Sequence, residues 1–281
     1  MRTLKSVREI AIERAEECCN MVSARFLPSV RIIYGSGEDL KPVSIGTCFF
    51  LRISNCSLLV TAAHVIDQNK YTALYVGDVN GLIPIQGDFW ATKAPEENRN
   101  LDHYDFAFWK VSDAMLNRLT NAKFIIEREI SRNRGTMDGR QFLAMGYPVS
   151  LNQFVDEEHL QVPAKAWTYQ GSHRSNEVLA AKLKVSGHDH FFIKFDEYSG
   201  NYNGDVHSSM DPTGISGGVL IDLGLPGPNQ LATGTSCIGL LAGIGIEHYK
   251  AHKALVYVKI GMVVDKILER FSLVAPGASA D

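Results

Sequence analysis

The first 25 residues carry a helical pattern of apolar positions. Apolar side chains recur there at intervals of three and four residues, at Leu4, Val7, Ala11, Ala15, Cys18 and Val22. Charged residues fill most of the other positions, so the pattern predicts an amphipathic helix that ends near Ala24. Such a helix packs on the body of the protein or presents a face to a partner, and packing is the commoner outcome.

From Phe26 onward the pattern changes to short apolar runs separated by turn residues. Before position 121 these runs cover 30–34, 46–53, 57–61, 72–76, 82–85 and 106–111. After position 139 they cover 142–146, 164–169, 179–185, 191–195, 218–222, 236–242 and 255–259. Runs of this length and spacing predict an all-β fold, either a barrel or a sandwich.

The segment 121–139 interrupts the strand pattern with charged residues and Gly135, which predicts a connection between two lobes. Near the C-terminal end, Val263, Val264, Ile267 and Leu268 have helical spacing, which predicts a short closing helix. We therefore expect an N-terminal helix (1–25), a first β-unit (26–125), a second β-unit with the closing helix (126–272) and a flexible tail (273–281).

Composition narrows the class of protein. Among 281 residues, 45% are hydrophobic and 21% are charged, as in ordinary globular proteins. The net charge of −3 gives no basic footprint for nucleic acid, and no segment is apolar for long enough to cross a membrane. The start of the chain lacks the apolar core of a signal peptide, and the five cysteines form no metal-type pair. We expect reduced, buried thiols and a cytoplasmic location.

The stretch around Ser216 is the strongest candidate for chemistry. Gly214, Gly217 and Gly218 surround this serine, so the backbone can turn sharply, bring amides close to a bound group and expose the hydroxyl. A glycine-rich turn with no function has the same composition. The functional interpretation therefore requires a base and an orienting acid elsewhere in the chain.

Two further segments supply such partners. A buried apolar run leads through two small alanines to His64, which can then be directed into a cleft. Asp105 directly precedes another apolar strand, where a carboxylate needs a hydrogen-bonding partner and an imidazole would serve. Asp102 competes with Asp105 for this role. We prefer Asp105, because it directly precedes the strand, whereas Asp102 is the better candidate for a loop residue.

The three segments resemble the catalytic signatures of chymotrypsin/trypsin-like serine proteases. TAAH ends at His64, DFAF begins at Asp105 and GISGG surrounds Ser216, in the order found in that family. GTCFFL from Gly46 is similar to the strand before its histidine, and GYP from Gly146 is similar to a segment of the bacterial HtrA-type branch. Three motifs in this order are more specific than any one of them.

The resemblance implies two antiparallel β-barrels with an active site between them. It implies a serine endopeptidase in which Ser216 attacks the peptide carbonyl, His64 transfers the proton and Asp105 orients His64. The backbone amides of Gly214 and Ser216 would form the oxyanion hole. Neither a metal nor an organic cofactor is then required, and the partner is a protein or peptide substrate.

The chain also departs from the family pattern. Members activated by trimming carry an aspartate immediately before the serine, whereas this chain has Ile215, so that route is not expected. The flanking cysteine of secreted members is missing, since Val65 follows His64. These departures indicate an intracellular, HtrA-like branch, here without a PDZ module. An unrestrained protease inside a cell is harmful, so we expect gating, with an activating partner as one route.

The resemblance also suggests where the substrate pocket lies. By motif matching, its lining comes from the segment before the serine and from a later strand, which here gives Met210, Asp211, Thr213, Ala242 and Gly243. Met210 favours an apolar pocket, whereas an inward-pointing Asp211 favours a basic side chain. A shift of one residue reverses this choice, so both remain open.

The remaining motifs carry less information. His188 and His190 have a spacing that suits a metal, but a preceding Ser-Gly pair favours a solvated hairpin turn. His248 and His252 are expected on an exposed loop. The Gly- and Asn-rich segment 199–205 is a candidate order–disorder switch for the oxyanion hole.

Two other functions compete with the protease. One is a catalytically silent fold of the same type that serves as a binding or regulatory module. The other is a Gly-x-Ser-x-Gly esterase, which would need alternating strands and helices and a buried strand before the serine.

Overall fold

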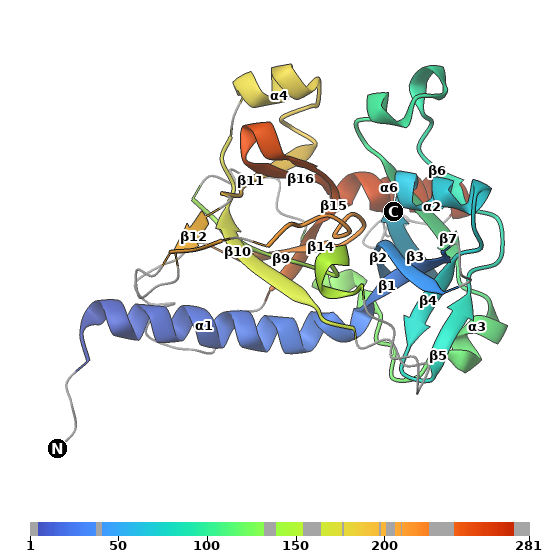
Figure 1. Ribbon diagram of the computed structural model, residues 1–281, viewed down its shortest axis with the longest axis horizontal. Helices are drawn as coiled ribbons and strands as arrows, with labels where there is room; N and C mark the ends of the chain where they lie inside the picture. Colours follow the sequence, from blue (N-terminus) through green and yellow to red (C-terminus); the bar gives the residue numbers. More distant parts are fainter. Residues whose placement is uncertain are drawn as a thin grey trace, which may run out of the picture.

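The computed structural model describes residues 5–37, 41–131, 139–153, 164–175, 177–196, 198–200, 206–208, 210–224 and 239–272. These residues are mostly β-structure, in two large antiparallel sheets flanked by an N-terminal and a C-terminal helix (Figure 1). The predicted all-β, double-barrel architecture is confirmed, together with both predicted terminal helices. The predicted flexible tail, 273–281, lies outside the described residues.

The first sheet follows the strand order β5-β4-β1-β2-β3-β7-β6, and β8 pairs in parallel with β2 beside this path. Its strands are β1 (Val30–Ser36), β2 (Pro42–Ile53), β3 (Cys56–Ala62), β4 (Tyr75–Asp78), β5 (Gly81–Pro84), β6 (Trp90–Ala91), β7 (Phe106–Lys110) and β8 (Ile125–Ile126). Alternating side chains of these strands, such as Ile33, Phe50, Leu59 and Trp109, fill a closed apolar core. This core gives rigid support to the ends of β3 and β7.

The second sheet follows the order β10-β9-β14-β15-β16-β11. Its strands are β9 (Gln141–Gly146), β10 (Trp167–Ser172), β11 (His190–Lys194), β14 (Val219–Gly224), β15 (Leu240–Tyr249) and β16 (Ala254–Lys259). A separate two-stranded ribbon joins β12 (Tyr198–Gly200) to β13 (Val206–Ser208). Of the predicted connection between lobes, residues 132–138 lie outside the described residues.

Most helices in the described part of the chain are short. The α-helices described there are α1 (Val7–Phe26), α2 (Ala63–Asp67), α3 (Asp113–Arg118), α4 (Glu177–Leu183) and α6 (Ile260–Phe271). Single 3-10 turns occur at Leu27–Ser29, Gln68–Lys70, Pro95–Glu97, Arg99–Leu101, Glu127–Glu129, Val149–Leu151 and Lys250–His252.

Helix α4 corrects one strand assignment. The run 179–185 was predicted as a strand, but the chain is helical from Glu177 to Leu183. Leu179, Ala180 and Leu183 are the buried residues, and their spacing places them on one helical face. Alanine, leucine, lysine and glutamate also favour the helix, so the short apolar run was misassigned by periodicity.

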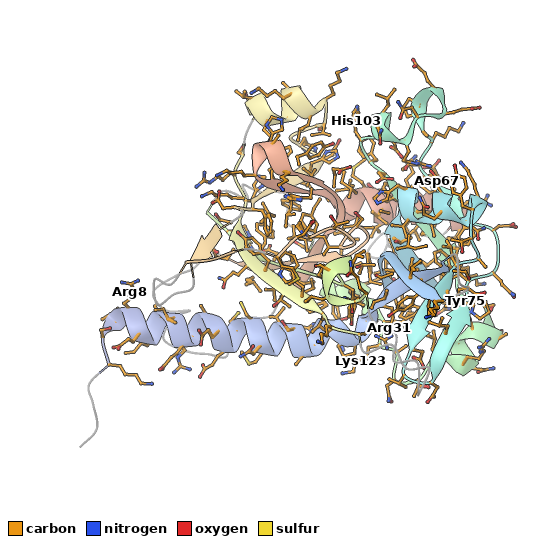
Figure 2. All side chains as sticks on the ribbon, in the orientation of Figure 1. Arg8, Arg31, Asp67, Tyr75, His103 and Lys123 are labelled. Atoms are coloured by element: carbon orange, nitrogen blue, oxygen red, sulfur yellow. The ribbon has the colours of Figure 1, made fainter. Side chains whose placement is uncertain are left out.

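The terminal helices close a core that both sheets share. Val22 and Phe26 at the end of α1 and Val263 and Ile267 on α6 belong to one apolar cluster with strands of both sheets. The other end of α1 extends away from this contact, and Figure 2 shows Arg8 on the opposite side of the molecule from Asp67. A capping box between Ser6 and Glu9 begins the helix.

The expectation of reduced thiols holds for three of the described cysteines and fails for one. Cys19, Cys48 and Cys56 are free, as predicted, and burial raises the pKa of the Cys19 thiol to about 11. Cys18, however, is disulfide-bonded, so the expectation is wrong for this residue. Local spacing predicted only that the adjacent thiols point apart on α1, because a disulfide depends on what the tertiary fold places opposite them.

Candidate active site

Sheet register brings His64 and Asp105 together. Strands β3 and β7 are antiparallel, and Ala62 pairs with Phe106, so the residues that follow β3 lie beside the residue that precedes β7. The backbone N–H of Ala63 donates to the Asp105 carbonyl at 3.0 Å. The backbone N–H of His64 donates to Oδ1 of Asp105 at 2.9 Å. The carboxylate thus accepts from the otherwise unpaired first turn of α2.

The side chains of the same two residues also bond to each other. Nδ1 of His64 lies 2.5 Å from Oδ2 of Asp105. Because Nδ1 faces the carboxylate, Nε2 is left as the ring nitrogen for proton transfer. Asp105 has φ of +43°, in the left-handed region that non-glycine residues rarely occupy. Strain of this kind persists only where the surroundings impose it, as the two backbone bonds do here.

Ser216 lies on a turn directly before β14. The amide of Ile215 donates to the Pro212 carbonyl at 3.0 Å, and that of Gly218 donates to the Ile215 carbonyl at 2.7 Å. Gly217, with φ of +85°, donates to Gly245 on β15 at 2.7 Å. These backbone bonds set the turn against the second sheet.

Thr47 on β2 holds this turn from the other side. Its amide donates to the Ser216 carbonyl at 2.9 Å, and its hydroxyl donates to the Gly214 carbonyl at 2.9 Å. The same hydroxyl accepts from the amide of Tyr147 at 3.0 Å. One fully buried threonine of the first sheet therefore connects to three backbone groups of the second unit.

Close packing explains the glycine at position 217. A Cβ atom there would lie 1.9 Å from the Thr47 carbonyl oxygen and 2.4 Å from the Thr61 hydroxyl. No side chain fits at these distances, and the positive φ adds a second reason for glycine. The sequence pattern around Ser216 thus reflects a close approach of two backbones.

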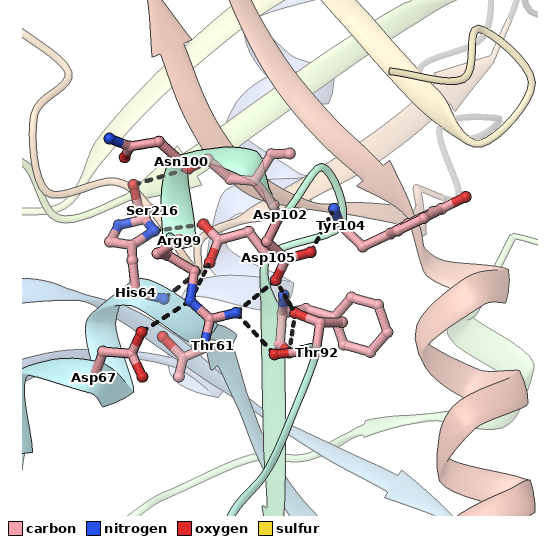
Figure 3. A network of polar contacts seen from close by, with 12 residues as sticks. Thr61, His64, Asp67, Thr92, Arg99, Asn100, Asp102, Tyr104, Asp105 and Ser216 are labelled. Carbon is pink, nitrogen blue, oxygen red and sulfur yellow. Dashed lines mark hydrogen bonds and ion pairs between the residues drawn. The ribbon is translucent and has the colours of Figure 1, made fainter. Parts of the chain in front are cut away.

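The Ser216 hydroxyl points toward the His64 ring, on the side away from Asp105 (Figure 3). Its oxygen lies 3.4 Å from the carbonyl oxygen of Ile246 on β15, to which it donates a long hydrogen bond. Among the described residues no hydrogen bond joins this hydroxyl to the His64 ring, and catalytic hydrogen bonds of this kind often tighten only when substrate binds. The structure therefore brings together the three residues that the sequence singled out, one from each motif.

Two backbone amides beside Ser216 are available to a ligand. Within the described residues, no protein acceptor takes the amide hydrogen of Gly214 or of Ser216. The intervening residue, Ile215, is buried against Gly146 and keeps the turn in place by apolar contact. These amides are the ones that the sequence assigned to an oxyanion hole.

The charges around His64 act in opposite directions. Burial lowers the pKa of His64, but the hydrogen bond and charge of Asp105, with Glu247 in addition, raise it above its ordinary value. Arg99 opposes that rise. Burial raises the pKa of Asp105, and its bonds to His64 counteract that increase. The pair is therefore set to hold a proton on the imidazole more firmly than a free histidine does.

The predicted pocket residues separate into two groups. Met210, Asp211 and Thr213 precede Ser216 on its own turn, and hydrogen bonds from Thr213 hold the pKa of the exposed Asp211 below its ordinary value. Ala242 and Gly243 instead lie inside the second sheet, where Ala242 belongs to its apolar core and a Cβ at Gly243 would meet Val258. The structure does not bring these two beside Ser216.

A later part of β15 approaches the site in their place. Gly245 exchanges backbone bonds with Gly217 and Gly218, Ile246 accepts from Ser216, and the exposed Glu247 follows. Ile246 and Glu247 were not predicted at the site, because the predicted strand 236–242 starts and ends earlier than β15. The β14–β15 register ends at Val219 and Ile244, and the backbone bonds of Gly245 to the Ser216 turn bring the residues that follow it to the site.

Asp102 proves to belong to a network behind the triad candidates (Figure 3). Arg99 donates to Asp102 and to Asp67, and Thr92 also donates to Asp102. Asp102 thus has its own cationic partner, whereas Asp105 faces His64. The loop position expected for Asp102 agrees with this, but the sequence offered no signal for Arg99.

The remaining histidines have structural surroundings. His188 is exposed on the predicted turn. His190 is fully buried at the start of β11, so the prediction of a solvated turn holds for His188 and fails for His190. His248 lies on β15 against Phe195 rather than on a loop. Across the described part of the chain, no group of three potential ligands is placed to hold a metal ion. The same residues include no helix that is long and apolar enough to span a membrane.

The structure describes only part of the candidate switch segment. Of the candidate switch 199–205, residues 201–205 lie outside the described residues, and 199–200 belong to β12.

No protein-family model matches the sequence, and no curated protein matches it. Among solved structures, the chain is similar to the VesB protease of Vibrio cholerae, with a TM-score of 0.56 and 14% identity. That match covers 90% of this chain and 66% of the VesB chain, so this chain spans just under two thirds of that length. A structure of Glu endopeptidase in complex with MPD matches with a TM-score of 0.48 and 17% identity, over 87% of this chain and 90% of that one. The VesB likeness and the two antiparallel sheets together give this chain the trypsin-like double-barrel fold.

Proposed function

We propose that the chain is a serine endopeptidase in which Ser216, His64 and Asp105 form the catalytic triad. The observation that carries this proposal is the position of the His64 ring, bonded to a buried carboxylate on one side and facing the Ser216 hydroxyl on the other. The likeness in fold to VesB protease is consistent with peptide bonds as the substrate. The substrate class is therefore protein or peptide.

In the proposed reaction, Nε2 of His64 takes the proton of the Ser216 hydroxyl as its oxygen attacks the peptide carbonyl. Asp105 stabilises the imidazolium that forms and does not itself take the proton. The amides of Gly214 and Ser216 donate to the carbonyl oxygen as it becomes an oxyanion, each contributing about 3 kcal/mol to the transition state. His64 then protonates the leaving amine, and water hydrolyses the acyl-enzyme by the same steps.

We also propose that the nucleophile turn needs no proteolytic trimming. The residue before Ser216 is the buried, apolar Ile215, which packs against Gly146 and has no charge to pair with a new N-terminus. Thr47 and Gly245 hold the turn through backbone bonds in the intact chain. The uncut protein is therefore expected to react at Ser216.

The pocket is proposed to lie between the segment before Ser216 and the end of β15. Met210 to Thr213 supply one side, as the sequence suggested, and Ile246 and Glu247 supply the other. Glu247 is exposed and acts electrostatically on His64, so it is part of the substrate's immediate surroundings.

The fold weighs against the esterase alternative, whereas a catalytically silent binding module would have this same fold. An esterase elbow requires alternating strands and helices around a mostly parallel sheet, whereas both large sheets here are antiparallel along their main paths.

The Cys18 disulfide is typical of oxidising compartments, so it weighs against the predicted cytoplasmic location. The HtrA-like branch and an activating partner stay predictions.

The test is covalent labelling of the uncut protein with a fluorophosphonate probe, followed by mass mapping. We expect stoichiometric modification at Ser216 that Ser216→Ala and His64→Ala abolish. Ser172→Ala, on β10, is the matched control and should label like the wild type. Absence of labelling in the wild type would reject a preformed triad and leave either a site that awaits the predicted activating partner or a silent fold with a binding role.

A further inference from the structure

The candidate triad rests on a second polar cluster that the sequence did not indicate. Arg99 lies on a 3-10 turn ahead of β7 and is largely buried, with a side-chain exposure of 18%. Its Nε donates to Oδ2 of Asp67 at 2.8 Å, and its Nη1 lies 2.5 Å from Oδ2 of Asp102. The same Nη1 donates to the Thr92 carbonyl at 2.8 Å. Arg99 thus has three partners of its own.

These partners lie on the elements that carry the two first-sheet triad residues. Asp67 is three residues after His64 on the short helix α2. Asp102 belongs to the loop that leads into Asp105, and it also accepts from the amide of Tyr104 at 3.1 Å. Arg99 therefore joins the helix of the base to the loop of the acid, as Figure 3 shows.

Arg99 also reaches the triad acid directly. Its Nε lies 4.0 Å from Oδ1 of Asp105, the carboxylate oxygen that accepts from the His64 amide. The other oxygen, Oδ2, is the one that faces the ring. The guanidinium thus stands behind the His64–Asp105 pair, and its charge acts on both members.

The charged and titratable groups around the His64 ring come from four elements. They are Asp67 on α2, Arg99 on its 3-10 turn, Asp102 and Asp105 ahead of β7, and Glu247 and Tyr249 on β15. Four of these groups are carboxylates, and Arg99 is the cation. Without it, the surrounding negative charge would favour the imidazolium, which cannot accept a proton.

We propose that Arg99 is a positioning residue of the triad, which locks the His64–Asp105 pair in place and keeps the imidazole able to accept a proton near neutral pH. This inference rests on the proposed protease function. Arg99 acts through His64 and Asp105, so it influences the rate of proton transfer rather than the binding of substrate. A lysine keeps the charge but cannot bridge two carboxylates with a fixed planar group.

A second buried arginine provides a matched control. Arg140 donates to Asp222 through Nε and Nη2, the latter at 2.7 Å. The side-chain exposures of this pair are 20% and 2%, against 18% and 4% for Arg99 and Asp102. Asp222 lies on β14, farther along the strand from Ser216 than Val219. Arg140→Gln therefore breaks a comparable buried pair away from His64.

The experiment measures the His64 pKa by proton NMR and the kinetics of peptide hydrolysis in Arg99→Gln, Arg99→Lys and Arg140→Gln. The His64 resonance is assigned by its loss in His64→Ala. We expect Arg99→Gln to raise the His64 pKa by roughly half a unit or more, because a nearby cation is removed. We expect its kcat to fall about 10- to 100-fold, with KM unchanged, through misplacement of the base.

Arg99→Lys should leave the His64 pKa near the wild-type value while kcat falls, because charge is kept and geometry is lost. If Arg99→Gln does not fold, Arg99→Lys alone tests whether Arg99 positions the His64–Asp105 pair. Arg140→Gln should lower thermal stability and leave both the pKa and kcat unchanged. If the Arg99 variants match Arg140→Gln in pKa and kcat, the inference is overturned.

The two proposals fail in different ways. If the protease proposal is wrong, the wild type does not label at Ser216, whatever Arg99 does. If only the Arg99 inference is wrong, the wild type labels and hydrolyses peptides, and the His64 titration is unchanged in Arg99→Gln. The NMR titration is measured without catalysis, so it reports on the charge of Arg99 in either case.

Discussion

The two halves of the candidate site are held by different interactions. His64 and Asp105 come from the first sheet and lie within a cluster of ionised side chains, with Arg99 behind them. Ser216 comes from the second unit, and its turn is held by backbone hydrogen bonds, the buried Thr47 and the close approach at Gly217. One half depends on charge and the other on backbone geometry.

This difference determines how each half should respond to change. Substitutions that alter charge at constant volume should damage the first half and change its pH dependence. Substitutions that add a methyl group, or remove a single hydroxyl, should damage the second half and leave its pH dependence alone.

The largest effect on the charged half is expected from Asp105→Asn. An amide in this position favours the wrong tautomer of His64, and loss of a triad acid typically lowers kcat about 10⁴-fold. Asp265→Asn, an exposed change on α6, is the control and should retain wild-type activity. Peptide hydrolysis by purified variants checks this, and a loss of less than tenfold would exclude Asp105 from the triad.

The largest effect on the backbone half is expected from Gly217→Ala. The added Cβ would lie 1.9 Å from the Thr47 carbonyl oxygen at a φ of +85°, so the turn must move. We expect a loss of at least about 3 kcal/mol in the free energy of unfolding, together with loss of labelling. Denaturant unfolding measures the first quantity.

Gly261→Ala is the matched control for this change. Gly261 lies in the first turn of α6, and a Cβ there meets nothing within 4 Å. Alanine in a helix is favoured over glycine by up to about 1 kcal/mol, so this variant should be as stable as the wild type or slightly more so. Equal losses in the two variants would contradict the packing account.

Thr47→Val tests the connection between the sheets. Valine keeps the volume but leaves the Gly214 carbonyl and the Tyr147 amide without their buried partner. We expect the unfolding free energy to fall by at least about 2 kcal/mol, since each of the two unsatisfied groups costs about 1–3 kcal/mol. Thr168→Val, exposed on β10, should change stability by less than about 0.5 kcal/mol. A neutral Thr47→Val would mean that other contacts hold the turn.

The smallest effect is expected from Glu247→Gln. Glu247 raises the His64 pKa, so its neutral amide should lower that pKa and move the acid limb of the activity profile to lower pH. Arg99→Gln should move the same limb upward. Equal shifts in one direction for both variants would show that the charges do not act as described.

The sequence predicted those parts of the site that have local signals. Apolar runs before His64 and after Asp105, and glycines around Ser216, place each residue at the end of a strand or on a turn. The double sheet and both terminal helices also followed from periodicity and from the resemblance. The single strands and helices depend on residues close together in the chain, whereas the arrangement of the strands in two sheets came from the resemblance.

The parts that failed depend on distant partners. Thr47 and Gly214 are 167 positions apart, and nothing near either residue indicates their bond. The position of Glu247 depends on how β15 pairs with β16 and bonds to the Ser216 turn through Gly245. The disulfide state of Cys18 depends on its tertiary surroundings. Segment 179–185 failed for a local reason, because a short apolar run suits a strand and a helix equally.

The central claim is that His64, bonded to Asp105, activates Ser216. The most direct test is the rate of Ser216 modification by a fluorophosphonate as a function of pH, in the wild type and in His64→Ala. The neutral imidazole is the base, and its pKa is raised, so the rate should increase through a single ionisation above about pH 6.5. His64→Ala should abolish this dependence together with the reaction. A modification rate that is independent of pH, or that survives in His64→Ala, would contradict the account.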